Sequence, residues 1–253
     1  MERLVKTRDD APQGFFAAEA AGLEWLAEAG GARTVRVIEV EPTRIVLERI
    51  DEARPSASAA AAFGAALAAT HDAGASGFGA PPPGWAGDIF IGRRSQPSRP
   101  QPTWGAFYAA QRVEPFLAPA VAAGNLSASG AAVVRRACAL ISAGAFDDGD
   151  APARLHGDLW AGNVLWSPEG VVLIDPAAHG GHRETDLAML ALFGCPHLGD
   201  IVDAYDHAHP LHDGWHDRVP VHQLHPLAVH AAGHGPSYGR ALVDAAERTL
   251  ALG

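Results

Sequence analysis

Cysteine is scarce in this chain of 253 residues, which contains only Cys138 and Cys195. Two cysteines form no disulfide framework, and they cannot supply the four ligands of a structural zinc site. We therefore expect two ordinary buried thiols, because free cysteine is among the most buried residue types.

Basic residues are also few, with 19 Lys and Arg against 29 Asp and Glu and a net charge of -10. This balance argues against general affinity for nucleic-acid backbones or anionic membranes, but it is compatible with a nucleotide bound through metal ions. No apolar run reaches the roughly 18 residues of a membrane span, and the N-terminus shows no signal peptide. We therefore expect a cytoplasmic protein with neither nucleic acid nor membrane as a partner.

Several catalytic motifs are missing as well. The sequence contains no Gly-x-Gly-x-x-Gly phosphate loop, no Gly-x-Ser-x-Gly elbow of a hydrolase and no His-Glu-x-x-His of a zinc protease. The adjacent acids Asp147 and Asp148 indicate an exposed turn, because nothing fixes their separation as in a glycosidase pair.

What is present is a change from strand patterns to helix patterns along the chain. Ser56 is a plausible helix N-cap, and Gly30-Gly31 stops the first helix. We expect strands over 3–7, 34–40 and 43–50 and a strand pair over 164–166 and 171–174. Helices are expected over 15–29, 57–71, 104–117 and 127–145, and again from 185 with a polar interruption at 196–220. A long loop is expected over 74–102. This order predicts an α+β fold with a small β-rich part of about residues 1–50 and a larger helical part over 51–253.

One group of residues carries recognisable chemistry. Asp158 is followed five residues later by Asn163, and Asp175 comes at the end of the predicted strand pair. Phosphoryl transfer needs a carboxylate to orient a hydroxyl and hard oxygen ligands for Mg²⁺, and this spacing matches the kinase catalytic loop. The alternative is a capped turn in which both side chains only make local hydrogen bonds. We expect His156 to brace the loop rather than act as the base.

These residues carry a family resemblance that extends over nearly the whole chain. The octapeptide His156–Asn163, with Trp160 in its centre, and Asp175-Pro176-Ala177 resemble the fructosamine kinase (ketosamine-3-kinase) family. That family belongs to the aminoglycoside-phosphotransferase-like branch of the protein-kinase-like superfamily. The likeness extends to residues 4–6, 16–23, 45–50, 67–71, 108–112 and 183–189.

The resemblance implies a bilobal protein-kinase-like fold that uses ATP and Mg²⁺, with a nucleotide-binding lobe of about 1–50. By it, Lys6 would hold the phosphates, Glu19 would position Lys6, and the hinge backbone around Glu48 and Ile50 would face adenine. Asp158 would be the base, Asn163 and Asp175 would bind the metal, and Trp160 would contact the acceptor. Asp186 is expected to anchor the loop after Asp175.

The acceptor implied by the resemblance is a ketosamine, a fructosamine or ribulosamine phosphorylated during protein deglycation. Two alternatives stay open: a kinase for another aminated or hydroxylated metabolite, such as an aminoglycoside, and a catalytically impaired nucleotide-binding homologue. The family's first hairpin, which covers the phosphates, is missing before Lys6, so we expect a shortened chain, a rebuilt lobe or weakened nucleotide binding. Without the resemblance, Lys6 and Glu19 could also be solvated surface charges.

Histidines and arginines outside this group leave further alternatives. Twelve of the 13 histidines follow residue 155, and the pairs His212/His216 and His230/His234 have the spacing of two ligands on one helix face. They could bind zinc or form a polar, pH-responsive helical surface. In the long loop, Arg93-Arg94 and Arg99 could meet an anionic acceptor or phosphates, or remain solvated.

Overall fold

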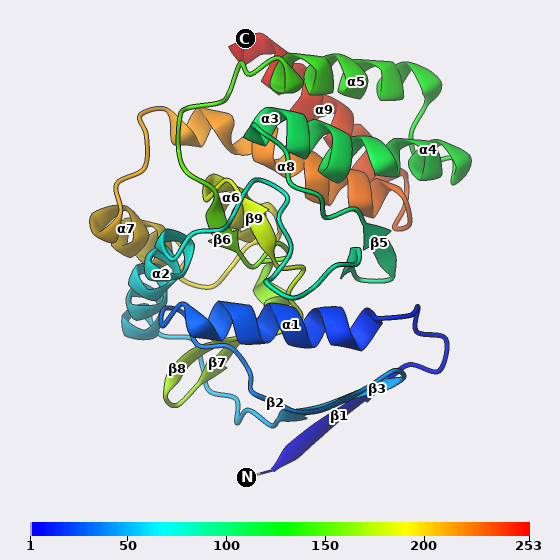
Figure 1. Ribbon diagram of the computed structural model, residues 1–253. Coiled ribbons are helices and arrows are strands. Elements are labelled where there is room, and N and C mark those ends of the chain that lie inside the picture. The colour runs from blue at the N-terminus through cyan, green and yellow to red at the C-terminus, as the bar shows by residue number, and fades with distance from the viewer. Residues whose placement is uncertain (1) are drawn as a thin grey trace.

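The computed structural model describes residues 2–253, and its N-terminal part is an antiparallel sheet covered by one helix (Figure 1). The strands β1 (Arg3–Thr7), β2 (Val37–Glu41) and β3 (Arg44–Glu48) pair in the order β1-β3-β2, and α1 (Phe15–Glu28) packs on them. The strands and the helix expected in this region are confirmed.

β3 is the central strand because its run Ile45-Val46-Leu47 is buried throughout. β1 is an edge strand, and its Leu4 and Val5 are about half exposed. The strand alternates in direction, so Lys6 between Val5 and Thr7 points to the other face, where it reaches α1. Strand alternation thus places the lysine beside the helix.

Helix α2 (Ala57–Asp72) begins where the sequence predicts. The Oγ of Ser56 accepts a hydrogen bond from the Ala59 amide at 3.3 Å, which confirms Ser56 as the N-cap. α2 packs closely along α7 (Leu198–Ala208). Gly64 permits this approach, because a Cβ there would lie 2.1 Å from the carbonyl oxygen of Ile201.

The segment 74–102 is mostly loop, as expected, but it is not irregular throughout. This segment contains the hairpin β4 (Ile89–Ile91) and β5 (Arg94–Gln96), joined by a two-residue turn in which Gly92 has φ 54°. Phe90 packs on Phe15 of α1 with ring centroids 5.2 Å apart. On the other side, Nη2 of Arg94 donates to the carbonyl oxygen of Ala232 at 2.5 Å. The hairpin therefore bridges the N-terminal helix and the C-terminal helical region.

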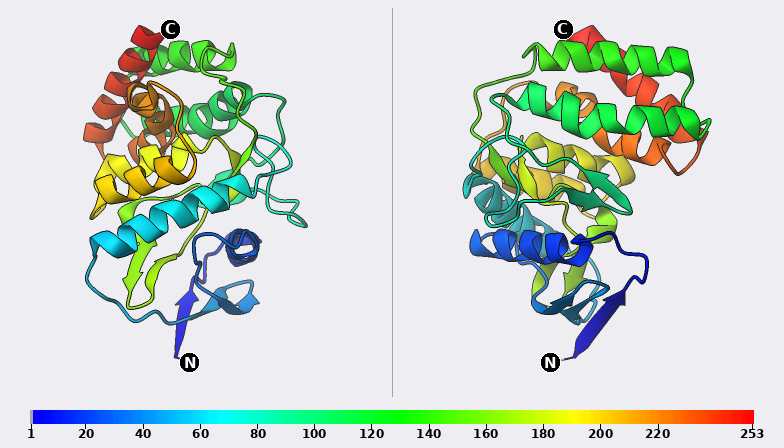
Figure 2. Two further views of the ribbon diagram at one scale, coloured as in Figure 1. Left: turned by 90° about the vertical axis from the view of Figure 1, so that its left-hand side faces the viewer. Right: turned by 45° about the vertical axis from the view of Figure 1, so that its right-hand side comes forward.

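A helical region forms the end of the molecule opposite the N-terminal sheet (Figures 1 and 2). Its members are α3 (Trp104–Phe107), a π-helical turn (Tyr108–Val113), α4 (Glu114–Ala122), α5 (Ala128–Ser142), α8 (Trp215–Ala231) and α9 (Pro236–Leu252). The helices expected over 104–117 and 127–145 are confirmed, although the π-helical turn was not predicted. At that turn the hydroxyl of Tyr108 donates to the carbonyl oxygen of His222 at 2.6 Å, which fastens α8 to it.

Short strands and one helix lie between the two ends. They are β6 (Ala153–Leu155), paired with β9 (His179–Gly181), the hairpin β7 (Val164–Ser167) and β8 (Gly170–Leu173), and α6 (Glu184–Phe193). The β7–β8 hairpin confirms the prediction, whereas the β6–β9 pair was missed. The polar interruption expected at 196–220 is wrong, because it contains α7, whose Ile201 and Tyr205 are completely buried.

The α+β class predicted from the order of patterns is confirmed. A division of the chain near residue 50 stays a prediction, since Val172 of β8 packs into the same core as Leu23 of α1 and Ile45 of β3. Across residues 2–253, none of the helices combines the length and apolar character that a bilayer crossing needs.

Candidate active site

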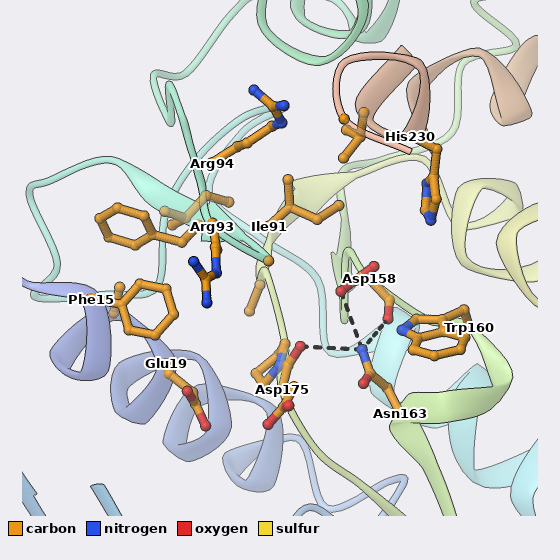
Figure 3. Close-up of a pocket in the computed structure, with 18 of the residues that line it drawn as sticks. Phe15, Glu19, Ile91, Arg93, Arg94, Asp158, Trp160, Asn163, Asp175 and His230 are labelled. Atoms are coloured by element: carbon orange, nitrogen blue, oxygen red, sulfur yellow. Dashed lines mark hydrogen bonds between the residues drawn. The ribbon is translucent and has the colours of Figure 1, made fainter. Parts of the chain in front are cut away.

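A cleft of about 740 Å³ opens between α1, the β4–β5 hairpin, the turn after β6 and the end of α8 (Figure 3). Elements far apart in the sequence supply its walls. Six of the residues given a catalytic, nucleotide, metal or acceptor role from the sequence line it: Lys6, Glu19, Asp158, Trp160, Asn163 and Asp175. The fold therefore brings the predicted catalytic and metal-ligating side chains to one place.

Lys6 is held by two carboxylates in the floor of the cleft. Its Nζ lies 2.8 Å from Oε1 of Glu19 and 2.5 Å from Oδ1 of Asp175. Burial opposes the charge on Lys6, but the attraction of both carboxylates outweighs it and raises the pKa of Lys6. Burial also raises the pKa of Glu19 against the pull of Lys6. A solvated strand-end lysine would have neither partner, so that alternative is wrong.

Asp175 has an unusual backbone. Its φ is 55°, in the left-handed region that few residues other than glycine adopt, although aspartate tolerates it better than most. The strand before it is held in place, since the amide of Ile174 donates to the carbonyl oxygen of Asn163 at 3.2 Å. Such conformations persist where surrounding structure enforces them and are concentrated at functional sites.

Asn163 connects the other two residues of the predicted site. Its Nδ2 donates to the carbonyl oxygen of Asp158 at 2.8 Å, to Oδ2 of Asp158 at 3.2 Å and to the carbonyl oxygen of Asp175 at 3.4 Å. These bonds include the local ones expected of a capped turn, but they also reach Asp175 and are made inside the cleft. With Nδ2 so engaged, Oδ1 of Asn163 is the atom left to accept from, or coordinate, a bound group.

Asp158 is largely buried and receives one side-chain hydrogen bond, from Asn163. Burial raises the pKa of Asp158 to about 7, the bond from Asn163 opposes the rise, and the charges of Asp175 and Asp186 add to it. A carboxylate with a pKa near the working pH has the properties of a general base.

The turn that carries Asp158 is anchored by Asp186 of α6. Oδ2 of Asp186 accepts from the amide of His156 at 2.8 Å, and its Oδ1 accepts from the amide of Gly157 at 3.0 Å. Asp186 therefore anchors the loop before Asp175, not the loop after it as expected. His156 braces the same turn as predicted, because its Nε2 donates to the carbonyl oxygen of Ile174 at 2.9 Å.

Trp160 lies at the rim of the cleft with 42% of its surface exposed. Its ring contacts Phe193 edge-on, with centroids 6.3 Å apart. It also covers Gly162, where a Cβ would come within 2.2 Å of the ring. An exposed tryptophan beside Asp158 offers a flat apolar face to a ligand.

Glu48 and Ile50 are not part of the cleft lining. A carboxylate oxygen of Glu48 instead accepts from Arg33 at 3.3 Å and from the amide of Arg36 at 3.1 Å. Ile50 packs beside the core of the N-terminal sheet. The resemblance implied that the backbone of this segment, and not its side chains, would face adenine, and that contact stays a prediction.

Several lining residues were not predicted from the sequence, namely Phe15, Phe90, Ile91, Gly92, Val229 and Gly233. Arg93, Arg94, His230 and His234 also line the cleft, and each of them was left with a binding role as one of two alternatives. A signal for the hairpin was available, because Gly92 and the residue after it separate two short runs, and a glycine in a two-residue turn is typical of a hairpin.

The histidine-rich region matches its two expectations only in part. His212 precedes α8, so it shares no helix face with His216, and its Nε2 lies 2.9 Å from Oδ1 of Asp150. The rings of His230 and His234 are 5.0 Å apart at the cleft. His222 and His225 are at most 2% exposed, and burial lowers the pKa of His222 to about 4. His222 and His225 are therefore buried, whereas His212, His216 and His234 are exposed, as expected of a polar helical surface.

Comparison with known proteins agrees with this geometry. The family model described as fructosamine kinase matches residues 2–251. A probable ketoamine kinase of Enterococcus faecium is 31% identical over 244 residues, which are 93% of this chain and 83% of that protein. The crystal structure of a putative fructosamine-3-kinase from Thermobifida fusca superposes with a TM-score of 0.90 at 46% identity, covering 98% of this chain and 85% of that one.

A more distant match concerns the fold alone. An aminoglycoside phosphotransferase structure has a TM-score of 0.58 at 17% identity, covering 99% of this chain and 86% of that one. The predicted protein-kinase-like fold is thereby confirmed. From the family match and the relatives, the chain belongs to the fructosamine kinase family.

Proposed function

We propose that this chain transfers the γ-phosphoryl group of ATP to a hydroxyl of a ketosamine, the sugar–amine adduct of a fructosamine or ribulosamine. The observation that carries the proposal is the meeting of Lys6, Glu19 and Asp175 with Asp158 and Asn163 in one cleft. Relatives named ketoamine kinases support the choice of acceptor. The reaction would serve the removal of sugars from glycated amines, including those of proteins.

In this proposal Lys6 binds the α- and β-phosphates and Glu19 keeps it in place. A lysine that already pairs with Asp175 at 2.5 Å lies where phosphates and a metal ion would meet. These residues fit Mg²⁺, because Asp175 could supply a carboxylate oxygen as a metal ligand and Asn163 its Oδ1, which is not used by the hydrogen bonds of Nδ2. Bound there, the ion would neutralise charge on the phosphates. The backbone at Glu48 and Ile50 would face adenine.

Asp158 performs the proton transfer. Its carboxylate accepts the proton of the sugar hydroxyl while that oxygen forms a bond to the γ-phosphorus and the bond from phosphorus to the bridging oxygen of ADP breaks. The pKa of about 7 allows Asp158 to be ionised before the reaction and protonated after it. Trp160 lies against the sugar and limits its orientations.

The test is turnover of ATP by the purified chain with Mg²⁺ and a panel of fructosamines, ribulosamines, free sugars and aminoglycosides. We expect ADP release that depends on a ketosamine and falls by a factor of roughly 10² to 10⁴ in Asp158→Asn. The matched control is Asp10→Asn, an exposed carboxylate outside the cleft lining. Failure of every ketosamine to stimulate ADP release, while Mg²⁺-ATP raises the melting temperature, would favour a catalytically impaired nucleotide-binding protein.

A further inference from the structure

One wall of the cleft carries two arginines and two histidines, although the whole chain has a net charge of -10. We call it the basic wall and define it by Arg93, Arg94, His230 and His234, which come from the β4–β5 hairpin, from α8 and from the turn that follows α8. The carboxylates that line the cleft are Glu19, Asp158 and Asp175, and none of them comes from these segments. The basic wall thus faces the catalytic residues without any acid of its own.

Arg93 and Arg94 differ in how they are bound. Arg94 turns away from the catalytic residues and donates to the carbonyl oxygen of Ala232 (Figure 3). Arg93 lies at the tip of the hairpin and extends into the space between Phe15 and Asp158 (Figure 3). Within residues 2–253 it makes no hydrogen bond or ion pair. Arg93 is therefore a cation whose donors are available to a ligand in the cleft.

A nearby acid does not account for Arg93. The pKa of Asp10 is lowered mainly by its hydrogen bond to Arg8, and Arg93 adds only a small contribution. Asp10 is fully exposed, so water screens this attraction. A guanidinium presents planar, paired donors that match a carboxylate, and a bidentate pair of this kind is among the stronger polar contacts.

His230 adds a neutral acceptor to the same wall. Its Nδ1 donates to the carbonyl oxygen of Pro226 at 2.8 Å, so Nε2 carries the lone pair. Burial lowers the pKa of His230, which keeps the ring uncharged at neutral pH. The ring points toward Trp160 (Figure 3). An uncharged Nε2 can accept a hydrogen bond from a sugar hydroxyl, whereas Arg93 requires an anion.

We propose that the acceptor is the sugar adduct of an amino acid and that Arg93 binds its free carboxylate. This rests on the proposed function and names the acceptor class within it. The sugar would lie between Trp160 and His230, and the amino-acid part would extend toward the hairpin. A polycation such as an aminoglycoside meets Arg93 without a compensating acid on that wall, so it is disfavoured by like charge.

The experiment compares two adducts that differ only in the carboxylate. The fructose and ribulose adducts of glycine and of glycinamide are assayed for ADP release with the full chain, Arg93→Gln and the control Arg99→Gln. Arg99 is an exposed arginine of the same segment outside the cleft lining. Dissociation constants of both adducts are also measured in the presence of Mg²⁺ and a non-hydrolysable ATP analogue.

We expect KM and the dissociation constant to be about tenfold lower for the glycine adduct, a ratio in the range of one charge-assisted hydrogen bond. Arg93→Gln should reduce this ratio to about one by weakening the glycine adduct, while Arg99→Gln keeps it. Equal binding of the two adducts by the unmodified chain would overturn the proposal. So would an Arg93→Gln variant that raises KM for ATP and leaves the ratio intact, because Arg93 would then bind phosphates.

The two proposals fail in different ways. If no adduct is turned over, the proposed kinase function fails, and the ratio of dissociation constants still decides the role of Arg93. If both adducts are turned over equally well, the kinase function stands and the carboxylate preference is wrong.

Discussion

Replacing Asp158 by Asn should make the protein more stable at alkaline pH while it removes catalysis. The folded chain keeps the Asp158 proton up to a pKa of about 7, whereas the unfolded chain releases it near 3.8. The free energy of unfolding of the unmodified protein therefore falls as pH rises between these values and levels off above about 7. Asn at this position has no proton to lose, and its Oδ1 can still accept from Asn163.

The size of the effect follows from the shift. A difference of about three pKa units corresponds to about 4 kcal/mol at 1.36 kcal/mol per unit if the whole shift is expressed. The range from pH 5 to the pKa of about 7 covers about two of these three units. Because the carboxylate keeps some contact with water, the effect is smaller than the full conversion gives. We therefore expect the stability of Asp158→Asn relative to the unmodified chain to grow by about 2 kcal/mol between pH 5 and pH 8. For a chain of this size that is a change of roughly 4–8 °C in melting temperature.

The assay is thermal unfolding of both proteins at pH 5, 6, 7 and 8 without nucleotide, with ADP release measured on the same samples. All other titrating groups are shared, so the difference between the two curves isolates Asp158. A difference that is constant with pH, or a variant less stable at pH 8 than at pH 5 relative to the unmodified chain, would refute the assigned pKa. In the unmodified enzyme, kcat/KM should fall about tenfold per pH unit below pH 7, because the base is then protonated.

Three further changes address the surroundings of Asp158. Lys6→Met should raise KM for ATP and lower kcat/KM by about 100-fold, measured by steady-state kinetics, because the cation on the phosphates is lost; an unchanged KM for ATP would contradict that role. Gly162→Ala should displace the ring of Trp160 and raise KM for the acceptor while KM for ATP stays constant. Asp186→Ala leaves two buried amides without acceptors and should lower the free energy of unfolding by about 2–4 kcal/mol in a denaturant titration; a smaller loss than that of Asp10→Ala would refute the anchoring role.

The site residues that could be predicted from the sequence alone are those that lie close to one another along the chain. Asp158 and Asn163 are five residues apart, and the β7–β8 hairpin then returns the chain to Asp175. A tight hairpin allows few arrangements, so spacing alone restricts where these side chains can meet. Lys6 and Glu19 required the family resemblance as well, because a strand and the following helix can pack in several registers.

The place of the β4–β5 hairpin at the cleft could not be predicted, because it depends on contacts between distant segments. The β4–β5 hairpin consists of two three-residue strands whose position is set by Phe15 and Ala232, residues far away in the chain. Strands this short leave little periodicity in the sequence. The burial of His222 and His225 was missed for a related reason, since α8 carries polar residues on the face that packs against the π-helical turn.

The family resemblance assigned Asp158 and Asp186 different roles, but the sequence could not show how the fold sets their protonation. Burial alone would raise the pKa of Asp186, but His71 and the amides of His156 and Gly157 donate to its carboxylate and lower the pKa below its ordinary value. Asp158 is partly buried and receives a side-chain hydrogen bond only from Asn163, so burial raises its pKa. The two carboxylates at the catalytic turn thus differ in the number of donors that each receives. Asp186 of α6 receives several, stays ionised and fixes the turn, whereas Asp158 receives one and is able to exchange a proton near neutral pH.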